Sequence, residues 1–216
     1  MKRRLFSAAA VGAMVAGAAL PAGAQTPARK PESGWDYLTL AKQVAVIAPA
    51  GSIEVVDFFW YNCPHCNAFE PALQAWMQRL PKDVAVRRVP VGFRDEFVPQ
   101  QRLFYTLSAM GLVNQLHGKV FAAIHNERVD LARGASILEW VGQQGVDKAR
   151  FAELYNSRAI QDAVSQATQL QDAYGVEGVP ALGVAGRFYT DGTIATNMPR
   201  ALQIADFLIA EVRSGR

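Results

Sequence analysis

The chain has only two cysteines, and both lie in the tetrapeptide Cys63-Pro64-His65-Cys66. A disulfide between such close cysteines closes a very small loop and removes little chain entropy, so it makes a poor structural staple. The preceding residues 53–60 are rich in β-branched and aromatic side chains, which predicts a buried strand. A dithiol that follows a strand and opens a helix is suited to redox exchange, because the helix N-terminus favours a thiolate.

The N-terminus has the features of a cleavable signal peptide over residues 1–24. It has a basic start at residues 2–4, an apolar stretch over residues 5–20 and small residues at 22–24. The apolar stretch is too short and too rich in glycine and alanine for a typical membrane span. Cleavage would leave a loose lead over residues 25–34 and a periplasmic protein in an oxidising compartment. The basic start leaves open whether export is general or of the twin-arginine type.

Removal of the signal peptide changes the charge of the protein. The full chain has 22 basic and 19 acidic residues, and residues 2–4 account for three of the basic ones. The remainder therefore has 19 of each sign and no net charge. The basic character of the whole chain then gives no support for nucleic-acid binding.

The pattern of the remaining residues predicts an α/β fold. It contains no internal repeats and no second membrane-spanning stretch. Apolar periodicity predicts, in order, a strand, a helix, a strand, a helical block, two short strands and a helix, at residues 53–60, 64–79, 84–91, 98–174, 181–185, 188–194 and from Pro199. The simplest packing is a mixed central sheet flanked by helices, with an inserted helical domain. We predict residues 35–97 and 166–216 as the two parts of the sheet domain and residues 98–165 as the insertion.

Several local features are expected within these elements. Residues 37–40 form a weaker strand candidate, and residues 84–91 are expected to be a buried strand. Pro71 lies inside the first helix and should kink it. Ser136 and Glu139 have the spacing of a capping box. Asp147 can cap a short helix that follows it.

The two cysteines have different expected roles. Cys63 is expected to be the exposed, attacking thiol and Cys66 the inward, resolving thiol. Pro64 is tolerated in the first helical turn, and the His65 ring can stabilise the Cys63 thiolate and lower its pKa. A stable thiolate favours the reduced enzyme, so its disulfide is readily given away. The alternatives are an inert bridge, a spacer histidine and a metal site.

Other polar residues are weaker candidates. Asp57 in the first strand can relay the proton of Cys66 or form an ion pair with Arg88 on the neighbouring strand, and the sequence leaves both possibilities open. His117 and His125 are interpreted as ordinary surface or half-buried histidines. A metal would need ligands besides the two sulfurs, and the histidines are poorly placed to supply them.

Together these features resemble the thioredoxin superfamily and, within it, the DsbA-like thiol-disulfide oxidoreductases. The resemblance rests on residues 58–66, whose sequence is Phe-Phe-Trp-Tyr-Asn-Cys-Pro-His-Cys, and on Gly178-Val179-Pro180. It covers roughly residues 35–211. The long separation between the cysteines and Pro180, which the helical block accounts for, is similar to the DsbA arrangement.

The resemblance implies a periplasmic enzyme that donates a Cys63–Cys66 disulfide to reduced, unfolded exported polypeptides. It implies a cis-Pro180 against the disulfide, and a Val179 backbone that binds substrate as an added strand. It also implies re-oxidation by a quinone-linked membrane partner of the DsbB type, without a cofactor or metal. We expect a monomer.

Some residues depart from the best-known members of this family. Arg88 takes the place of a lysine and Asp57 the place of a glutamate, and an arginine cannot deprotonate. Gly183 lies in the strand after Pro180, where it is unusual and can shorten the strand.

Three other functions remain open. An isomerase of this kind carries an N-terminal dimerisation domain, for which the residues before Trp35 leave no room, and the related reductases have a tryptophan where this chain has Asn62. A non-catalytic chaperone would keep all its activity after Cys63→Ser. A metal-binding protein would hold zinc or copper through both cysteines.

Overall fold

A computed structural model describes residues 29–215. The predicted signal peptide at residues 1–24 lies outside the described residues. The elements, in chain order, are β1 (Leu38–Thr39), β2 (Ile53–Phe59), α1 (Pro64–Gln78), β3 (Val84–Pro90), the 3₁₀ helix η1 (Asp95–Phe97), α2 (Val98–Ala109), α3 (Val113–His125), α4 (Gly134–Gln143), α5 (Lys148–Tyr155), α6 (Arg158–Tyr174), β4 (Ala181–Val184), β5 (Phe188–Asp191) and α7 (Met198–Arg213).

The strands form one mixed sheet in the order β1-β5-β4-β2-β3. β2 pairs in parallel with β3, so that Ile53 lies opposite Val84, and β2 pairs antiparallel with β4. β4 and β5 form an antiparallel pair, and β1 completes the far edge. This confirms the predicted mixed sheet, with the strand before the cysteines in its interior.

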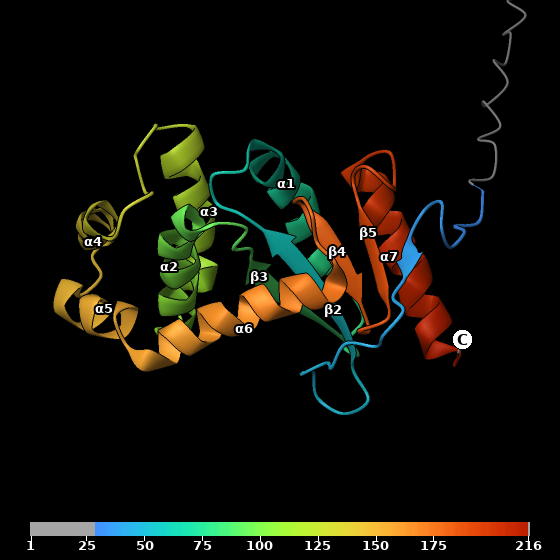
Figure 1. Ribbon diagram of the computed structural model, residues 1–216. Helices are drawn as coiled ribbons and strands as arrows, with labels where there is room; N and C mark the ends of the chain where they lie inside the picture. The colour runs from blue at the N-terminus through green and yellow to red at the C-terminus, as the bar shows by residue number, and fades with distance from the viewer. Residues whose placement is uncertain (1–28, 216) are drawn as a thin grey trace, which may run out of the picture. The chain divides into compact units, whose positions relative to one another are not determined.

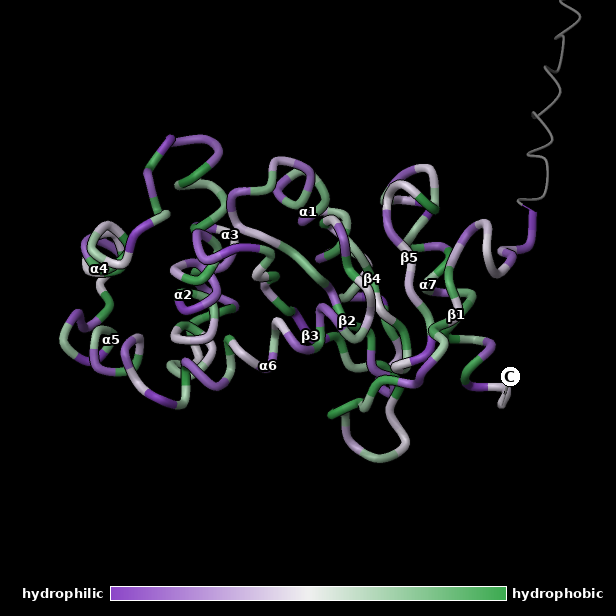
Figure 2. Tube along the Cα trace, viewed as in Figure 1, coloured by the Kyte–Doolittle hydropathy of each residue, from purple (hydrophilic) through white to green (hydrophobic). Residues whose placement is uncertain are grey.

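Helices cover both faces of this sheet. Successive side chains of a strand point to opposite sides, so the apolar residues of β2 pack against helices on each face. On β2, Ile53 and Val55 pack in a core with α1 and α7, whereas Val56 and Phe58 pack in a core with α6. Figure 1 shows α1 and α7 on the opposite side of the sheet from α6. In Figure 2 the helices alternate between hydrophilic and hydrophobic along their length, as amphipathic helices packed on a core do.

The helical block has a core of its own, and that core includes the cysteines. Cys63 and Cys66 belong to the same cluster of buried residues as the apolar side chains of α2 to α5. The end of β2 joins this cluster through Phe59, whose ring makes an edge contact with Phe104 of α2. The dithiol therefore lies between the sheet and the helical block.

The last helix of the block, α6, also packs on the sheet. Its C-terminal residue Tyr174 makes an edge contact with Phe58 of β2, and its hydroxyl accepts a hydrogen bond from the Gly186 N–H at 3.0 Å. Any side chain at Gly183 would collide with the Tyr174 ring, which occupies the space where a Cβ atom would lie. The glycine that is unusual for a strand thus provides the space in which α6 docks.

The structure corrects three local predictions. β3 is mostly half-buried rather than buried, since it is an edge strand of the sheet. α4 begins at Gly134, so Ser136 lies inside the helix and is not a capping residue. β5 ends at Asp191, because its carboxylate accepts from the Thr193 and Ile194 N–H groups and turns the chain.

Other local predictions are confirmed. Asp147 caps α5 by accepting from the N–H groups of Ala149 and Arg150. β1 forms within the weaker strand candidate but contains only Leu38 and Thr39. Within the described part of the chain, no helix combines the length and apolar character that crossing a membrane requires.

Candidate active site

Cys63 lies at the N-terminus of α1, directly after the end of β2. β2 ends at Phe59, and the Cys63 N–H donates to the Trp60 carbonyl at 3.1 Å, which closes a turn. Cys63 is the N-cap of α1, and its sulfur accepts from the Cys66 N–H at 3.2 Å. Pro64 begins the helix at a position where a missing N–H costs nothing. The sulfur therefore meets the positive end of the helix.

The two thiols differ sharply in acidity. A hydrogen bond from the Cys66 thiol lowers the pKa of Cys63 to about 6, against the opposing effect of partial burial. Burial raises the pKa of Cys66, and the neighbouring Cys63 sulfur raises it further. Both cysteines are free thiols in this structure. The pair is therefore arranged as a thiolate at Cys63 and a protonated thiol at Cys66.

His65 is exposed beside Cys63. Its backbone N–H and the charge of its ring both help to lower the pKa of Cys63, after the larger contribution of Cys66. The lowering of the Cys63 pKa by His65 agrees with the expectation. The Cys66 thiol and the backbone N–H groups of the helix terminus lower that pKa more than the His65 ring does.

Val179 and Pro180 lie next to the dithiol although they are far from it in sequence. The peptide bond between them is cis, as the resemblance implied. The Cys63 sulfur lies 3.4 Å from the Val179 carbonyl oxygen, to which it can donate when it is protonated. Both residues line a surface hollow of about 460 Å³ together with His65 and Met198. The hollow reaches from His65 to the first turn of α7, and Cys63 lies behind its wall rather than in its lining. Cys63 is only 7% exposed, so the expectation of an exposed attacking thiol is wrong: the sulfur is covered where it contacts Val179.

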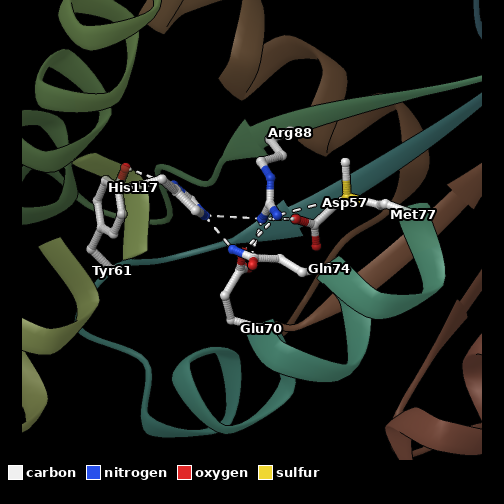
Figure 3. A network of polar contacts seen from close by, with 7 residues as sticks. All are labelled: Asp57, Tyr61, Glu70, Gln74, Met77, Arg88 and His117. Atoms are coloured by element: carbon white, nitrogen blue, oxygen red, sulfur yellow. Dashed lines mark hydrogen bonds and ion pairs between the residues drawn. The ribbon is translucent and has the colours of Figure 1, made fainter. Parts of the chain in front are cut away.

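A buried group of charged residues links β2, α1, β3 and α3 (Figure 3), and its member Asp57 lies close enough to Cys66 for its charge to affect that thiol. Arg88 of β3 donates to both oxygens of Glu70 in α1, at 2.7 and 2.6 Å. It also donates to Asp57 of β2, at the longer distance of 3.2 Å. The anticipated contact between Asp57 and Arg88 exists, but the main partner of Arg88 is Glu70.

The two carboxyl groups that contact Arg88 have opposite pKa shifts. Burial raises the pKa of Asp57 to about 7, although Arg88 acts in the other direction. Burial also disfavours the charge of Glu70, but the contacts with His117 and Arg88 outweigh it and lower the pKa of Glu70 to about 2. The charge of Asp57 is among the causes that raise the pKa of Cys66. Asp57 is therefore a carboxyl group that can hold a proton near Cys66 at neutral pH.

His117 joins this group, which corrects its interpretation as an ordinary histidine. It is 3% exposed, and its Nε2 lies 2.9 Å from Arg88 while its Nδ1 lies 2.8 Å from the Tyr61 hydroxyl. His125 is half-buried, and its Nε2 lies 2.8 Å from the Tyr61 carbonyl oxygen. Both histidines therefore contact a residue of the turn before Cys63.

Sequence reasoning missed Glu70, His117 and Tyr61. Glu70 had a detectable signal, because it lies beside the apolar row of α1 that includes Phe69 and Leu73. His117 and the following Phe121 share a face of α3, again on its buried side. A charged or titratable residue on an apolar helix face needs a partner in the interior. The partners come from other elements, and the sequence does not name them.

Arg88 and His117 also line a second, shallower hollow of about 310 Å³ together with Gln74 and Met77. The buried charged group thus comes close to solvent at a point away from Cys63. Among residues 29–215, no group of three or more histidine, cysteine or acidic side chains is placed to hold a metal ion.

The sequence model of the DSBA-like thioredoxin domain matches residues 54–203, a span that includes β2, both cysteines, the helical block and Pro180. The chain belongs to this family. It is therefore a thiol-disulfide oxidoreductase with a thioredoxin-like fold, and the matched span contains the dithiol described above.

Relatives of this DsbA-like chain match it over most of their length. It is 38% identical over 190 residues to a "Thiol:disulfide interchange protein DsbA" of Burkholderia cepacia, covering 88% of this chain and 90% of the relative. It is 40% identical over 182 residues to the protein of the same name from Pseudomonas aeruginosa, covering 84% and 86%.

Solved structures show the same likeness. The crystal structure of Pseudomonas aeruginosa DsbA superposes with a TM-score of 0.80 at 40% identity, covering 84% of this chain and 94% of that one. The oxidoreductase DsbA from Xylella fastidiosa gives a TM-score of 0.80 at 29% identity, covering 85% and 98%. The similarity extends over the sheet and the helical block together.

Proposed function

We propose that this enzyme is a periplasmic oxidase, which donates a Cys63–Cys66 disulfide to newly exported polypeptides. The observation that carries the direction of transfer is the stabilised Cys63 thiolate, whose pKa is lowered to about 6. A thiolate that is stable at neutral pH stabilises the reduced enzyme and is a good leaving group. The oxidised enzyme therefore tends to accept electrons from substrate thiols.

The proposed reaction has two exchange steps. A substrate thiolate attacks the Cys63 sulfur, the disulfide between the cysteines breaks, and the Cys66 sulfur leaves and takes up a proton. A second substrate thiolate then attacks the substrate sulfur of the mixed disulfide, and Cys63 leaves as a thiolate. The substrate loses two electrons and gains a disulfide, while the enzyme gains the two electrons as a dithiol.

Asp57 is proposed to supply the proton that Cys66 takes up. Its raised pKa of about 7 means that a buried carboxylic acid is available at neutral pH. Arg88 remains charged throughout, so its proposed role is to hold Glu70 and Asp57 rather than to relay a proton.

The hollow beside Pro180 is the proposed substrate site. Its lining by Val179 and Pro180 leaves the reactive sulfur next to backbone groups, which can pair with an extended polypeptide of any sequence. His65 and Met198 give the same hollow an apolar and polarisable wall. A broad range of unfolded substrates suits such a surface.

Export and re-oxidation complete the proposal. The signal peptide predicted over residues 1–24 would deliver the protein to the periplasm, and a quinone-linked membrane enzyme of the DsbB type would restore the disulfide. We further propose that residues 98–165 are an inserted helical domain, that residues 35–97 and 166–216 form the sheet domain, and that the protein works as a monomer.

The deciding experiment is the equilibrium of the Cys63–Cys66 couple against glutathione. The fluorescence of Trp60, which belongs to the turn before Cys63, provides a readout. We expect the enzyme to be reduced even in a fairly oxidising buffer. An enzyme that stays oxidised until the buffer is strongly reducing would instead be a reductase, and the proposed direction of transfer would be wrong.

A further inference from the structure

The turn from Trp60 to Cys63 determines where the reactive sulfur lies. Tyr61 and Asn62 occupy the two central positions of this turn, which the Cys63 N–H closes on the Trp60 carbonyl. Because Cys63 is the N-cap of α1, the turn decides whether its sulfur faces the Cys66 N–H. Whatever holds the turn therefore also holds the thiolate at the helix terminus.

Side chains outside the sheet contact each of the three residues before Cys63. The Trp60 ring stacks on Phe97 of η1, with ring centroids 4.0 Å apart. The Asn62 side chain accepts from Gln100 of α2 at 2.7 Å. Tyr61 receives its contacts from α3. Contacts with η1, α2 and α3 thus hold the turn on one side.

One row of α3 contacts Tyr61 at both ends. His117, Phe121 and His125 are spaced four residues apart and so share a helix face. His117 reaches the Tyr61 hydroxyl and His125 its carbonyl oxygen, each at 2.8 Å. Between them, the Phe121 ring makes an edge contact with the Tyr61 ring at 5.1 Å between centroids.

The partners of each ring indicate the direction of both histidine hydrogen bonds. His117 Nε2 lies 2.9 Å from an Arg88 nitrogen, which can only donate, and 3.5 Å from Glu70 Oε2, which can only accept. The shorter contact assigns Nε2 as the acceptor, so that His117 Nδ1–H donates to the Tyr61 hydroxyl oxygen. Burial lowers the pKa of His117, which agrees with this neutral ring. A carbonyl can only accept, so His125 donates through its Nε2–H. Both rings therefore donate to Tyr61, His117 through Nδ1–H and His125 through Nε2–H.

We propose that His117 and His125 are positioning residues, which hold Tyr61 and thereby keep the Cys63 sulfur at the N-terminus of α1. They touch no reacting atom and act through the turn. The inference deepens the proposed function, since it concerns the thiolate on which disulfide donation depends. A purely structural role for the histidines would change the stability of the fold without changing the acidity of Cys63.

The first test is a double-mutant cycle on the contact between His117 and Tyr61. Tyr61→Phe, His117→Leu and the double variant are compared with the parent for the glutathione equilibrium and for the Cys63 pKa, which is read from thiolate absorbance. We expect each single variant to raise the Cys63 pKa and shift the equilibrium toward oxidised enzyme by about threefold to tenfold, the effect of a lost hydrogen bond. The double variant should shift it no further than His117→Leu.

The second test uses His125, where the donor can be replaced. His125→Gln retains an N–H donor and should keep the equilibrium within about twofold of the parent, whereas His125→Leu should shift it like the His117 variant. Tyr155→Phe is the matched control, because it removes a tyrosine hydroxyl of the same block that donates to the Pro99 carbonyl, away from the turn. If a leucine variant does not fold, Tyr61→Phe and His125→Gln carry the test.

Two results would overturn the inference. The first is an unchanged Cys63 pKa and equilibrium in folded Tyr61→Phe, His117→Leu and His125→Leu. The second is full additivity of the His117 and Tyr61 effects, which would mean that His117 acts through Arg88. Failure of the proposed function is a separate outcome, because it is read from the equilibrium of the parent enzyme alone.

Discussion

The two sides of the dithiol are built differently. Beside Cys63 lies an open hollow whose wall includes the backbone of Val179 and Pro180. Beside Cys66 lies a buried group of charged residues, in which Arg88 holds Glu70 closely and Asp57 at a longer distance. The first side exposes groups that any extended polypeptide can contact. The second encloses titratable groups and fixes their protonation.

If the proposed function is right, substrate contact and proton control are separated in space. A change in the hollow should alter how well a polypeptide binds while leaving the chemistry of the thiols intact. A change in the buried group should alter pH dependence and thiol acidity while leaving substrate binding intact. The following variants test that separation.

The largest effect is expected from the cysteines themselves. Cys63→Ser removes the sulfur that the substrate thiolate attacks and should lower the rate of thiol-disulfide exchange at least about a thousandfold. Cys66→Ser keeps the thiolate of Cys63 but cannot resolve its bonds, so it should accumulate mixed disulfides visible on non-reducing gels. Full retention of activity in Cys63→Ser would mean that the protein acts as a non-catalytic chaperone rather than as an oxidoreductase.

Asp57→Asn tests proton control on the Cys66 side. The folded pKa of about 7 exceeds the ordinary value of 3.8, so the folded protein binds more protons between these pH values and loses stability as pH rises. Asparagine removes this loss. The variant should be more stable than the parent by about 2 to 4 kcal/mol near pH 8, and equally stable near pH 4, in urea unfolding.

The matched control for this variant is Asp83→Asn, because Asp83 forms a surface ion pair with Arg213. Its stability difference from the parent should be within about 1 kcal/mol at both pH values. A parent-like pH profile in Asp57→Asn would mean that Asp57 is ionised in the folded protein near neutral pH.

Met198→Glu tests the Cys63 side. The residue lies in the first turn of α7, where an acidic side chain suits the helix dipole, so the fold should tolerate it. The new charge in the hollow should raise the KM for a reduced unfolded protein by about threefold to tenfold. The glutathione equilibrium should not move. A shift in that equilibrium would contradict the separation of the two sides.

The smallest effect is expected at the margin of the charged group. Gln74 is exposed and donates to Glu70 at 2.8 Å, but Arg88 already holds the same carboxylate. Gln74→Ala should lower the free energy of unfolding by less than about 1 kcal/mol and leave the pH profile of stability unchanged. A large loss would show that Arg88 alone does not satisfy Glu70.

The sequence allows the dithiol and its local frame to be predicted, because their signals are local. An apolar run predicts β2, the spacing after Cys63 predicts α1, and Asp147 marks the start of α5. The cis bond at Pro180 was an expectation from family resemblance rather than from residue chemistry. Each of the locally predicted features depends on residues near one another in the chain.

Only the contact between Asp57 and Arg88 could be anticipated within the buried charged group, because the strands that carry them were predicted as neighbours. The rest of the group could not be predicted, because its members meet only in the folded chain. Asp57, Glu70, Arg88 and His117 come from β2, α1, β3 and α3 respectively. Nothing close to His117 in sequence offers it a partner, so the pattern favoured an ordinary histidine. β3 was expected to be buried because most of its residues are apolar, and its position at the sheet edge depends on the order of all five strands.

The course of α6 limits how this protein can be shortened or recombined. One unbroken helix of 17 residues begins in the helical block and ends on the sheet, with Tyr174 in the space above Gly183. An engineer who excised the block would have to cut through this helix rather than through a loop. A chimera that exchanged helical blocks between relatives would need matching contacts at both ends of α6. The helical block and the sheet therefore have to be exchanged together.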